Sequence, residues 1–268
     1  MKFYEVLESI LQTSSIKEKE ALIKRAFLLL DREEFDKDFS PKDINTPSYA
    51  KICKIVDPKT LPLRKNFDSD EGMAKLLHSI VHIEYSAIDL AVDAVYRYPF
   101  MPKEFKKDWL EVALEEIRHF KMLEEILRSL GYKYGDFPVH SGLMDAAYAS
   151  KEDILERMAV VPRYYEAGGL DVNPQIMKKV DSSKHPFKES VLEALKIIYK
   201  EEISHVYKGN KWFRYLCKER GVSENIYFDI LQKYNLLKKH RPYVNVEARK
   251  KAGFSCEEIL KLGAKRCD

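Results

Sequence analysis

Two short segments of the chain place a carboxylate and an imidazole one helical turn apart. Glu116 is followed by His119, and Glu202 is followed by His205, so each segment has the pattern Glu-x-x-His. In a helix, positions i and i+3 lie on one face, and their side chains are close enough to hold one ion. Two such pairs suggest a site for two metal ions.

Each motif contains a second glutamate, so the phase of the helix decides which acid points inward. At about 100° per residue, Glu116 and Glu202 align with the apolar stripes of their helices. Glu115 lies at the margin of its stripe, and Glu201 is rotated away from its own. The phase therefore predicts Glu116 and Glu202 as ligands, and Glu115 and Glu201 as bystanders.

A third acid lies in the apolar stripe of the long helix predicted from Asp70 to Tyr98. Glu84 is the only charged member of that inward stripe. Burying an unpaired ionised glutamate costs several kcal/mol even after relaxation. Glu84 must therefore be protonated, paired with a cation, or bound to a metal.

The fourth acid belongs to a helix predicted to begin near Ser150 and to end at Gly168 and Gly169. Glu166 is in line with its apolar stripe, while Glu156, the alternative, is about 80° out of phase. Pro162 lies inside this helix, and an interior proline removes a backbone hydrogen bond. We therefore expect a kink or π-type irregularity just before Glu166, a kind of defect often found at functional sites.

The remaining elements supply the framework for these residues. We expect an all-α protein with three parts: N-terminal helices and an extended strap (1–69), a four-helix bundle (70–220), and a C-terminal helical extension (221–268). Sparse glycine and proline favour helices over sheets. Outside the segments already given, helices are predicted at 2–12, 16–34, 102–131, 187–219, 223–239 and 255–264.

Three other polar residues are weaker candidates for the site. His82 is about 200° from Glu84 on the helical wheel, which favours a hydrogen-bonded packing role. His140 lies in a connection rich in turn residues, where histidines are more often structural or solvated. Arg64 lies in the predicted strap, for which a surface position is the favoured interpretation.

Composition excludes several classes of protein. The net charge of +3 arises from interspersed acids and bases, which indicates a solvated surface and not a nucleic-acid-binding face. No apolar run approaches the roughly 18 residues of a membrane span, so we expect a cytoplasmic protein. The four cysteines form no Cys-x-x-Cys pair and are expected to be reduced and free of metal; they are Cys53, Cys217, Cys256 and Cys267.

The full set of one acid, a Glu-x-x-His, one acid and a second Glu-x-x-His occurs on four successive amphipathic helices. This order matches the carboxylate-bridged dimetal pattern of ferritin-like bundles. Two divalent cations would neutralise the four inward carboxylates, which would otherwise repel one another in a low-dielectric core. The predicted metal ligands are Glu84, Glu116, His119, Glu166, Glu202 and His205.

The sequence also resembles the uncharacterised bacterial family known as domain of unknown function 455, a ferritin-like group, from about Arg64 to Phe254. The resemblance implies the bundle fold and a dimetal site, but no reaction. The segments that carry it are His82–Glu84, Ala87–Ala91, Phe105 with Asp108–Leu110, Tyr134–Pro138 with His140, Val161–Arg163 with Glu166–Ala167 and Gly169–Val172, Glu202–Ile203 with His205–Val206 and Gly209, and Trp212–Phe213.

Three functions are compatible with this pattern. The first is an oxidoreductase or oxygenase that uses O2 or peroxide through two iron ions, or through manganese or a mixed pair, on a small-molecule substrate. The second is a metal-binding or peroxide-scavenging protein without an organic substrate. The third is a metal-free helical scaffold. The sequence specifies neither the electron donor nor the oligomeric state.

Overall fold

The computed structural model describes residues 1–32, 39–61, 66–237 and 243–267. These ranges contain helices and no strand, with one isolated parallel bridge between Ile55 and Val139, which confirms the predicted all-α class. The helices are α1 (Phe3–Gln12), α2 (Ile16–Asp31), α3 (Asp70–Arg97), α4 (Lys103–Ser129), α5 (Gly142–Ala149), α6 (Ile154–Val160), a π-helix (Val161–Glu166), α7 (Ala167–Asp181), α8 (Lys188–Arg220), α9 (Ile226–Lys233), α10 (Val246–Lys251) and α11 (Cys256–Lys261), with short 3-10 turns at Ser48–Lys51 and Pro58–Thr60.

The chain divides into two compact units. The first contains Met1–Asp145 and Ser183–Ala194, and the second contains Ala146–Ser182 and Leu195–Asp268. Helix α8 therefore begins in the first unit and continues through the second. The N-terminal helices α1 and α2 belong to the same unit as α3 and α4, while the three-part domain organisation expected from the sequence stays a prediction.

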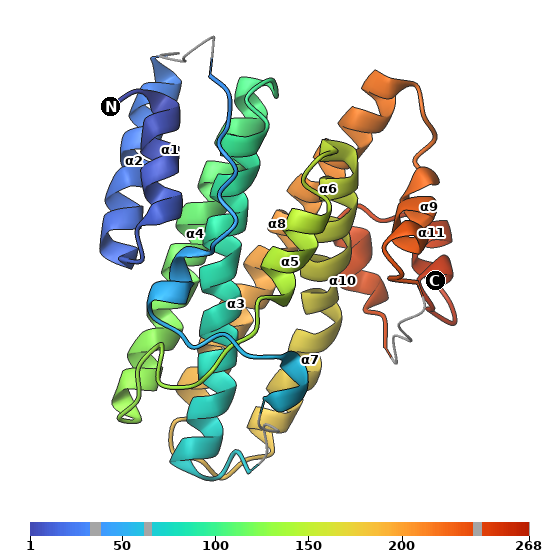
Figure 1. The fold of residues 1–268 in the computed structure, drawn as a ribbon. Coiled ribbons are helices and arrows are strands. Elements are labelled where there is room, and N and C mark those ends of the chain that lie inside the picture. Colours follow the sequence, from blue (N-terminus) through green and yellow to red (C-terminus); the bar gives the residue numbers. More distant parts are fainter. Residues whose placement is uncertain (33–38, 62–65, 238–242, 268) are drawn as a thin grey trace. The chain divides into compact units, whose positions relative to one another are not determined.

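Four helices pack together in the first unit (Figure 1). Helices α3 and α4 share the most extensive contact, α1 packs on α3, and α2 packs on α4. Helix α3 starts where the Ser69 hydroxyl accepts a hydrogen bond from the backbone N–H of Gly72 at 3.2 Å. The chain leaves α4 through Gly131, whose φ of +83° is readily adopted only by glycine.

The N-terminal helices also bury a charged pair against α3. The Lys19 ammonium lies 2.6 Å from the Asp89 carboxylate, with side-chain exposures of 0% and 2%. Lys19 also donates to the carbonyl of Ile10, and Asp89 accepts a hydrogen bond from Ser48. Helix α3 therefore buries carboxylates on two different faces, with Glu84 on one and Asp89 on the other.

The third predicted helix is longer and less regular than expected. It begins at Ile154, passes through the π-helix Val161–Glu166, and continues as α7 to Asp181. The expected π-type irregularity before Glu166 is confirmed. The predicted end at Gly168 and Gly169 is wrong, because both glycines lie within the first turn of α7, where the Ala167 carbonyl is held by a side chain from α10.

The second unit also contains a disulfide bond between Cys256 and Cys267. Their Cα atoms are 5.5 Å apart, within the ordinary range for a disulfide. The prediction that all four cysteines are free is therefore wrong for this pair. The remaining two, Cys53 and Cys217, are free thiols and buried. The chain folds back after α11, and a separation of 11 residues forms no recognisable motif.

Across the described ranges, none of the helices has both the length and the apolar character that crossing a membrane requires.

Candidate metal centre

Three of the predicted ligands lie together in the first unit. The Nδ1 atom of His119 is 3.2 Å from Oε2 of Glu84 and 3.3 Å from Oε2 of Glu116. Each residue offers one ligand atom, and these atoms lie within 4.8 Å of one another. All three side chains are buried, His119 completely. We call these three residues the first acid–histidine cluster.

The two long helices of the first unit bring this cluster together. Glu116 and His119 occupy positions i and i+3 of α4, on the stripe that also buries Trp109, and Glu84 comes from the neighbouring α3. Glu116 is buried while Glu115 is partly exposed, as the phase of the helix predicts.

Burial and mutual charge determine the protonation of the cluster. Burial raises the pKa of the Glu84 carboxyl well above its usual range, and the nearby Glu116 carboxylate raises it further. Burial alone would lower the pKa of His119, but its hydrogen bonds to Glu116 and Glu84 outweigh burial and raise it to about 11. The cluster therefore favours bound protons, on the Glu84 carboxyl and on the His119 imidazole.

A transition-metal ion fits this set of donors. Two carboxylates and one imidazole combine the oxygen and nitrogen ligands that such ions accept in proteins. A bound divalent cation would replace the proton in supplying positive charge between the acids. The chemistry of the cluster is thus compatible with metal binding.

The second Glu-x-x-His lies on α8 in the second unit. The Nδ1 atom of His205 is 3.6 Å from Oε1 of Glu202, and their side-chain exposures are 0% and 17%. We call these two residues the second acid–histidine pair. Both Glu201 and Glu202 are half-buried, so the contact with His205, and not burial, distinguishes Glu202.

Glu166 is the last residue of the π-helix and is half-buried. Its role as the fourth acid ligand stays a prediction. The alternative, Glu156, is already engaged with α9 and the residue after it: Lys233 and the Tyr234 hydroxyl each contact its carboxylate at 2.5 Å. Glu156 is therefore tied to the C-terminal region by two side-chain contacts.

The π-helix packs closely on α8 near the second pair. A Cβ atom added to Gly209 would lie only 2.3 Å from Cβ of Pro162, so a side chain at 209 would force the two helices apart. Gly209 follows His205 by one helical turn. This contact ties the irregular turn that ends at Glu166 to the segment of α8 that carries Glu202 and His205.

The two histidines that were weaker candidates, His82 and His140, make structural contacts. Both ring nitrogens of His82 are occupied, Nδ1 by the Tyr134 hydroxyl and Nε2 by the carbonyl of His140, each at 2.9 Å. The packing role predicted for His82 is confirmed. His140 accepts a hydrogen bond from the backbone N–H of Gly142 within its own loop. Arg64 lies outside the described residues.

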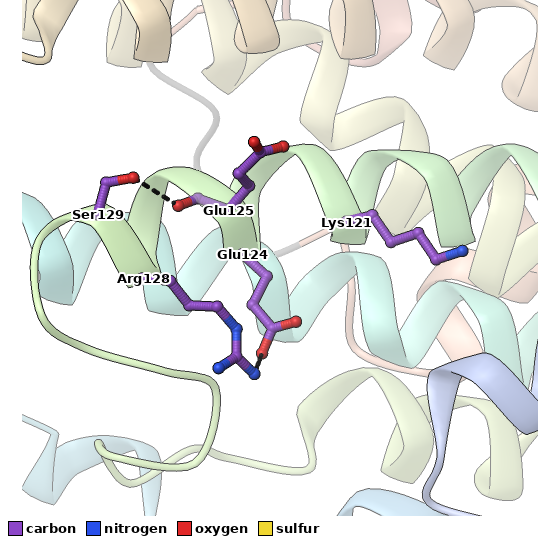
Figure 2. Close-up of a pocket in the computed structure, with 5 residues that line it drawn as sticks. All are labelled: Lys121, Glu124, Glu125, Arg128 and Ser129. Carbon is purple, nitrogen blue, oxygen red and sulfur yellow. Dashed lines mark hydrogen bonds and ion pairs between the residues drawn. The ribbon is translucent and has the colours of Figure 1, made fainter.

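A surface pocket on α4 does not belong to the candidate centre. Figure 2 shows its lining, which contains no histidine and consists of Lys121, Glu124, Glu125, Arg128 and Ser129. Arg128 pairs with Glu124 at 2.9 Å, and the Ser129 hydroxyl donates to the backbone carbonyl of Glu125. These are the contacts of a solvated helix surface.

Sequence reasoning missed two buried arginines near Glu166. Arg163 and Arg249 are fully buried in the second unit. Arg163 pairs with Glu258, and Arg249 pairs with Asp171. Arg249 lies in a run of charged residues and Arg163 in an apolar, aromatic segment, and the acid that pairs with each is far away in the sequence.

Comparison with known proteins finds relatives without an assigned reaction. The family described as "Protein of unknown function (DUF455)" matches residues 12–260. An uncharacterized protein of Haemophilus influenzae is 37% identical over 273 residues, which cover 96% of this chain and 92% of that protein. No solved structure matches the chain.

Proposed function

Since the chain belongs to the family described as protein of unknown function DUF455, which supplies no reaction, we propose a function from the chemistry of its buried acids and histidines. The protein is a dinuclear metal protein that uses O2 or peroxide to oxidise a small molecule. The observation that carries this proposal is the first acid–histidine cluster, in which two buried carboxylates converge on one imidazole nitrogen.

In this proposal the second half of the site comes from Glu166, Glu202 and His205. The order of acids and histidines along the chain is the same in both halves, which is the arrangement of ferritin-like dimetal bundles. Glu84, Glu116 and His119 would hold one ion, and Glu166, Glu202 and His205 would hold the other.

Iron is the leading candidate for both ions, with manganese or a mixed pair as alternatives. Mixed carboxylate and imidazole ligands suit these metals, whereas structural zinc prefers closed sites rich in cysteine and histidine. The free cysteines Cys53 and Cys217 do not belong to the group of side chains that could hold a metal among the described residues.

Bound redox-active ions would supply the electrons that reduce O2 or peroxide. The residues of the chain would hold and shield them. Burial of Glu84, Glu116 and His119 excludes bulk water and strengthens every charge interaction in the cluster. The pKa of His119, raised by its two acid partners, allows the imidazole to hold a proton until metal binding displaces it.

A metal-free scaffold is a second candidate, and one observation favours it. The contacts of His119 with Glu84 and Glu116 satisfy the first cluster with a proton alone. Metal storage or peroxide scavenging without an organic substrate would use the same ligands as the oxidoreductase. Metal content therefore separates the scaffold from the other two functions, and substrate-dependent oxygen consumption separates those two from each other.

The test is metal analysis of the purified protein after anaerobic loading with ferrous iron. We expect close to two ions per chain, because only a filled site neutralises the four proposed carboxylates. Glu116→Ala and Glu202→Ala should abolish binding, while the matched controls Glu115→Ala and Glu201→Ala should retain it. A wild-type protein that takes up no iron would refute the proposal, and loss of binding in Glu115→Ala would refute the assigned helix phase.

A further inference from the structure

The backbone that follows Glu166 is held by a buried arginine from α10. The Arg249 Nη2 atom donates to the carbonyl of Ala167 at 3.0 Å. The same guanidinium grips both carboxylate oxygens of Asp171, at 3.0 Å through Nε and 2.6 Å through Nη2. The Arg249 and Asp171 side chains are 0% and 4% exposed. Arg249 thus fixes the first turn of α7, which begins directly after Glu166.

The π-helix that ends at Glu166 is held by side chains from the same C-terminal region. The hydroxyl of Tyr227 in α9 donates to the carbonyl of Arg163 at 3.0 Å. The Arg163 guanidinium lies 4.1 Å from the centre of the Tyr227 ring, donates to Asn210 and pairs with Glu258 of α11. Glu166 therefore lies between two backbone carbonyls, each of which accepts a hydrogen bond from a side chain of the C-terminal helices.

Stability alone does not account for these buried charges. Replacing a buried ion pair by apolar residues of similar size is often neutral or stabilising. In addition, the Nη1 atoms of Arg163 and Arg249 are buried without a hydrogen-bond partner among the described residues, and an unsatisfied buried donor is unfavourable. The two buried guanidinium groups are therefore better explained by a need to hold the backbone on either side of Glu166 in place.

The π-turn makes position matter for Glu166. A π-turn contains one more residue than an α-turn, so its presence sets the direction of every side chain that follows. If the turn relaxed to a regular α-helix, the helix beyond it would rotate by about 100° relative to the segment before it. The contacts at Arg163 and Ala167 hold the turn on both sides of Glu166.

We propose that Arg249 and Tyr227 are positioning residues that aim the Glu166 carboxylate at the metal site by preserving the π-turn. This inference rests on the proposed dimetal function. It assigns a role to the C-terminal segment of the chain: α9 and α10 maintain the geometry of one ligand without contacting the metal. The chemical consequence is that one of the two ions depends on hydrogen bonds made outside the ligand set.

The experiment titrates apoprotein with Co²⁺ under anaerobic conditions and records the d–d absorption of the bound ion. Arg249→Lys keeps a positive charge opposite Asp171. It lacks the planar guanidinium, whose N–H groups reach Asp171 and the Ala167 carbonyl together. Tyr227→Phe removes only the hydroxyl that bonds the Arg163 carbonyl. Ile259→Ala removes buried apolar volume from α11 without removing either hydrogen bond, and it serves as the control for lost stability.

We expect wild-type protein to bind two Co²⁺ ions. Arg249→Lys and Tyr227→Phe should bind one of the two about tenfold more weakly, with an altered d–d spectrum, while Ile259→Ala keeps the wild-type affinity and spectrum. Wild-type spectra and affinities in both variants would overturn the positioning role and leave the dimetal proposal standing.

Changes of the same size in Ile259→Ala would also overturn the positioning role, because they would show that lost stability weakens Co²⁺ binding. A wild-type protein that binds no Co²⁺ would refute the proposed function together with the inference. If Arg249→Lys fails to fold, Tyr227→Phe decides alone.

Discussion

Removal of the buried Lys19 ammonium should be among the most destabilising single changes in the first unit. Lys19→Met keeps most of the side-chain volume but leaves the Asp89 carboxylate, 2% exposed, with Ser48 as its remaining hydrogen-bond partner among those described here. Breaking a buried pair by removing one partner typically costs about 3–5 kcal/mol, because the other charge stays buried and uncompensated. We expect a loss of unfolding free energy in that range at pH 7.

The stability loss of Lys19→Met should depend on pH, because Asp89 can take up a proton. Burial raises the pKa of Asp89 in the folded protein, and Lys19 opposes that rise. Without Lys19 the folded protein binds a proton at Asp89 more tightly than the unfolded chain does. Acidification from pH 7 should therefore reduce the stability deficit of Lys19→Met relative to wild type.

Urea unfolding followed by far-UV circular dichroism measures both effects. Lys24→Met is the matched control, because Lys24 lies on the same helix and pairs with Glu20 at 2.7 Å, yet its side chain is 63% exposed. That control should change stability by less than about 1 kcal/mol. The double variant Lys19→Met with Asp89→Leu should recover most of the loss. A Lys19→Met protein as stable as Lys24→Met would refute the reasoning.

Three further changes test other parts of the structure. Burial lowers the pKa of His78 from 6.5 to about 4. The unfolding free energy should therefore fall by about 3 kcal/mol as the pH falls from 6.5 to 4, because the unfolded chain binds the proton more tightly. In His78→Gln, the unfolding free energy measured with urea should change less over this pH range. Gly209→Ala should lower the melting temperature because its Cβ would clash with the π-helix, whereas Gly169→Ala, with nothing within 4 Å, should not. Glu166→Ala should keep partial iron affinity but lose reactivity with O2 in rapid mixing, whereas Glu156→Ala should react as wild type does; equal rates in the two variants would exclude Glu166 as a ligand.

Local periodicity explains why part of the site could be predicted from the sequence. Glu116 and His119 lie one turn apart on a regular helix, so their shared face follows from the geometry of the backbone alone. Glu84 stood out because it is an acid in an otherwise apolar stripe, and the structure buries it beside His119. In each case the informative signal lies within a few turns of one helix.

Contacts between distant segments could not be predicted in this way. Lys19 and Asp89 are 70 residues apart, and Arg249 and Asp171 are 78 residues apart, so no local pattern connects either pair. Lys19 did carry a usable signal, since it shares a helical stripe with buried Ile23 and Ala26. The predicted end of the third helix failed for the same reason, because the side chain that holds the backbone there comes from α10.

Two of the buried carboxylates of α3, Glu84 and Asp89, together limit how this helix can be rotated within its unit. Glu84 and Asp89 are separated by five positions, or about 140° around the helix axis, and each meets its partner on a different neighbouring element. A rotation of α3 by a single residue would strand both charges in apolar surroundings at once. The Lys19–Asp89 ion pair therefore prevents α3 from rotating about its axis. In this way a contact on one face of the helix fixes the direction of the Glu84 side chain on another face.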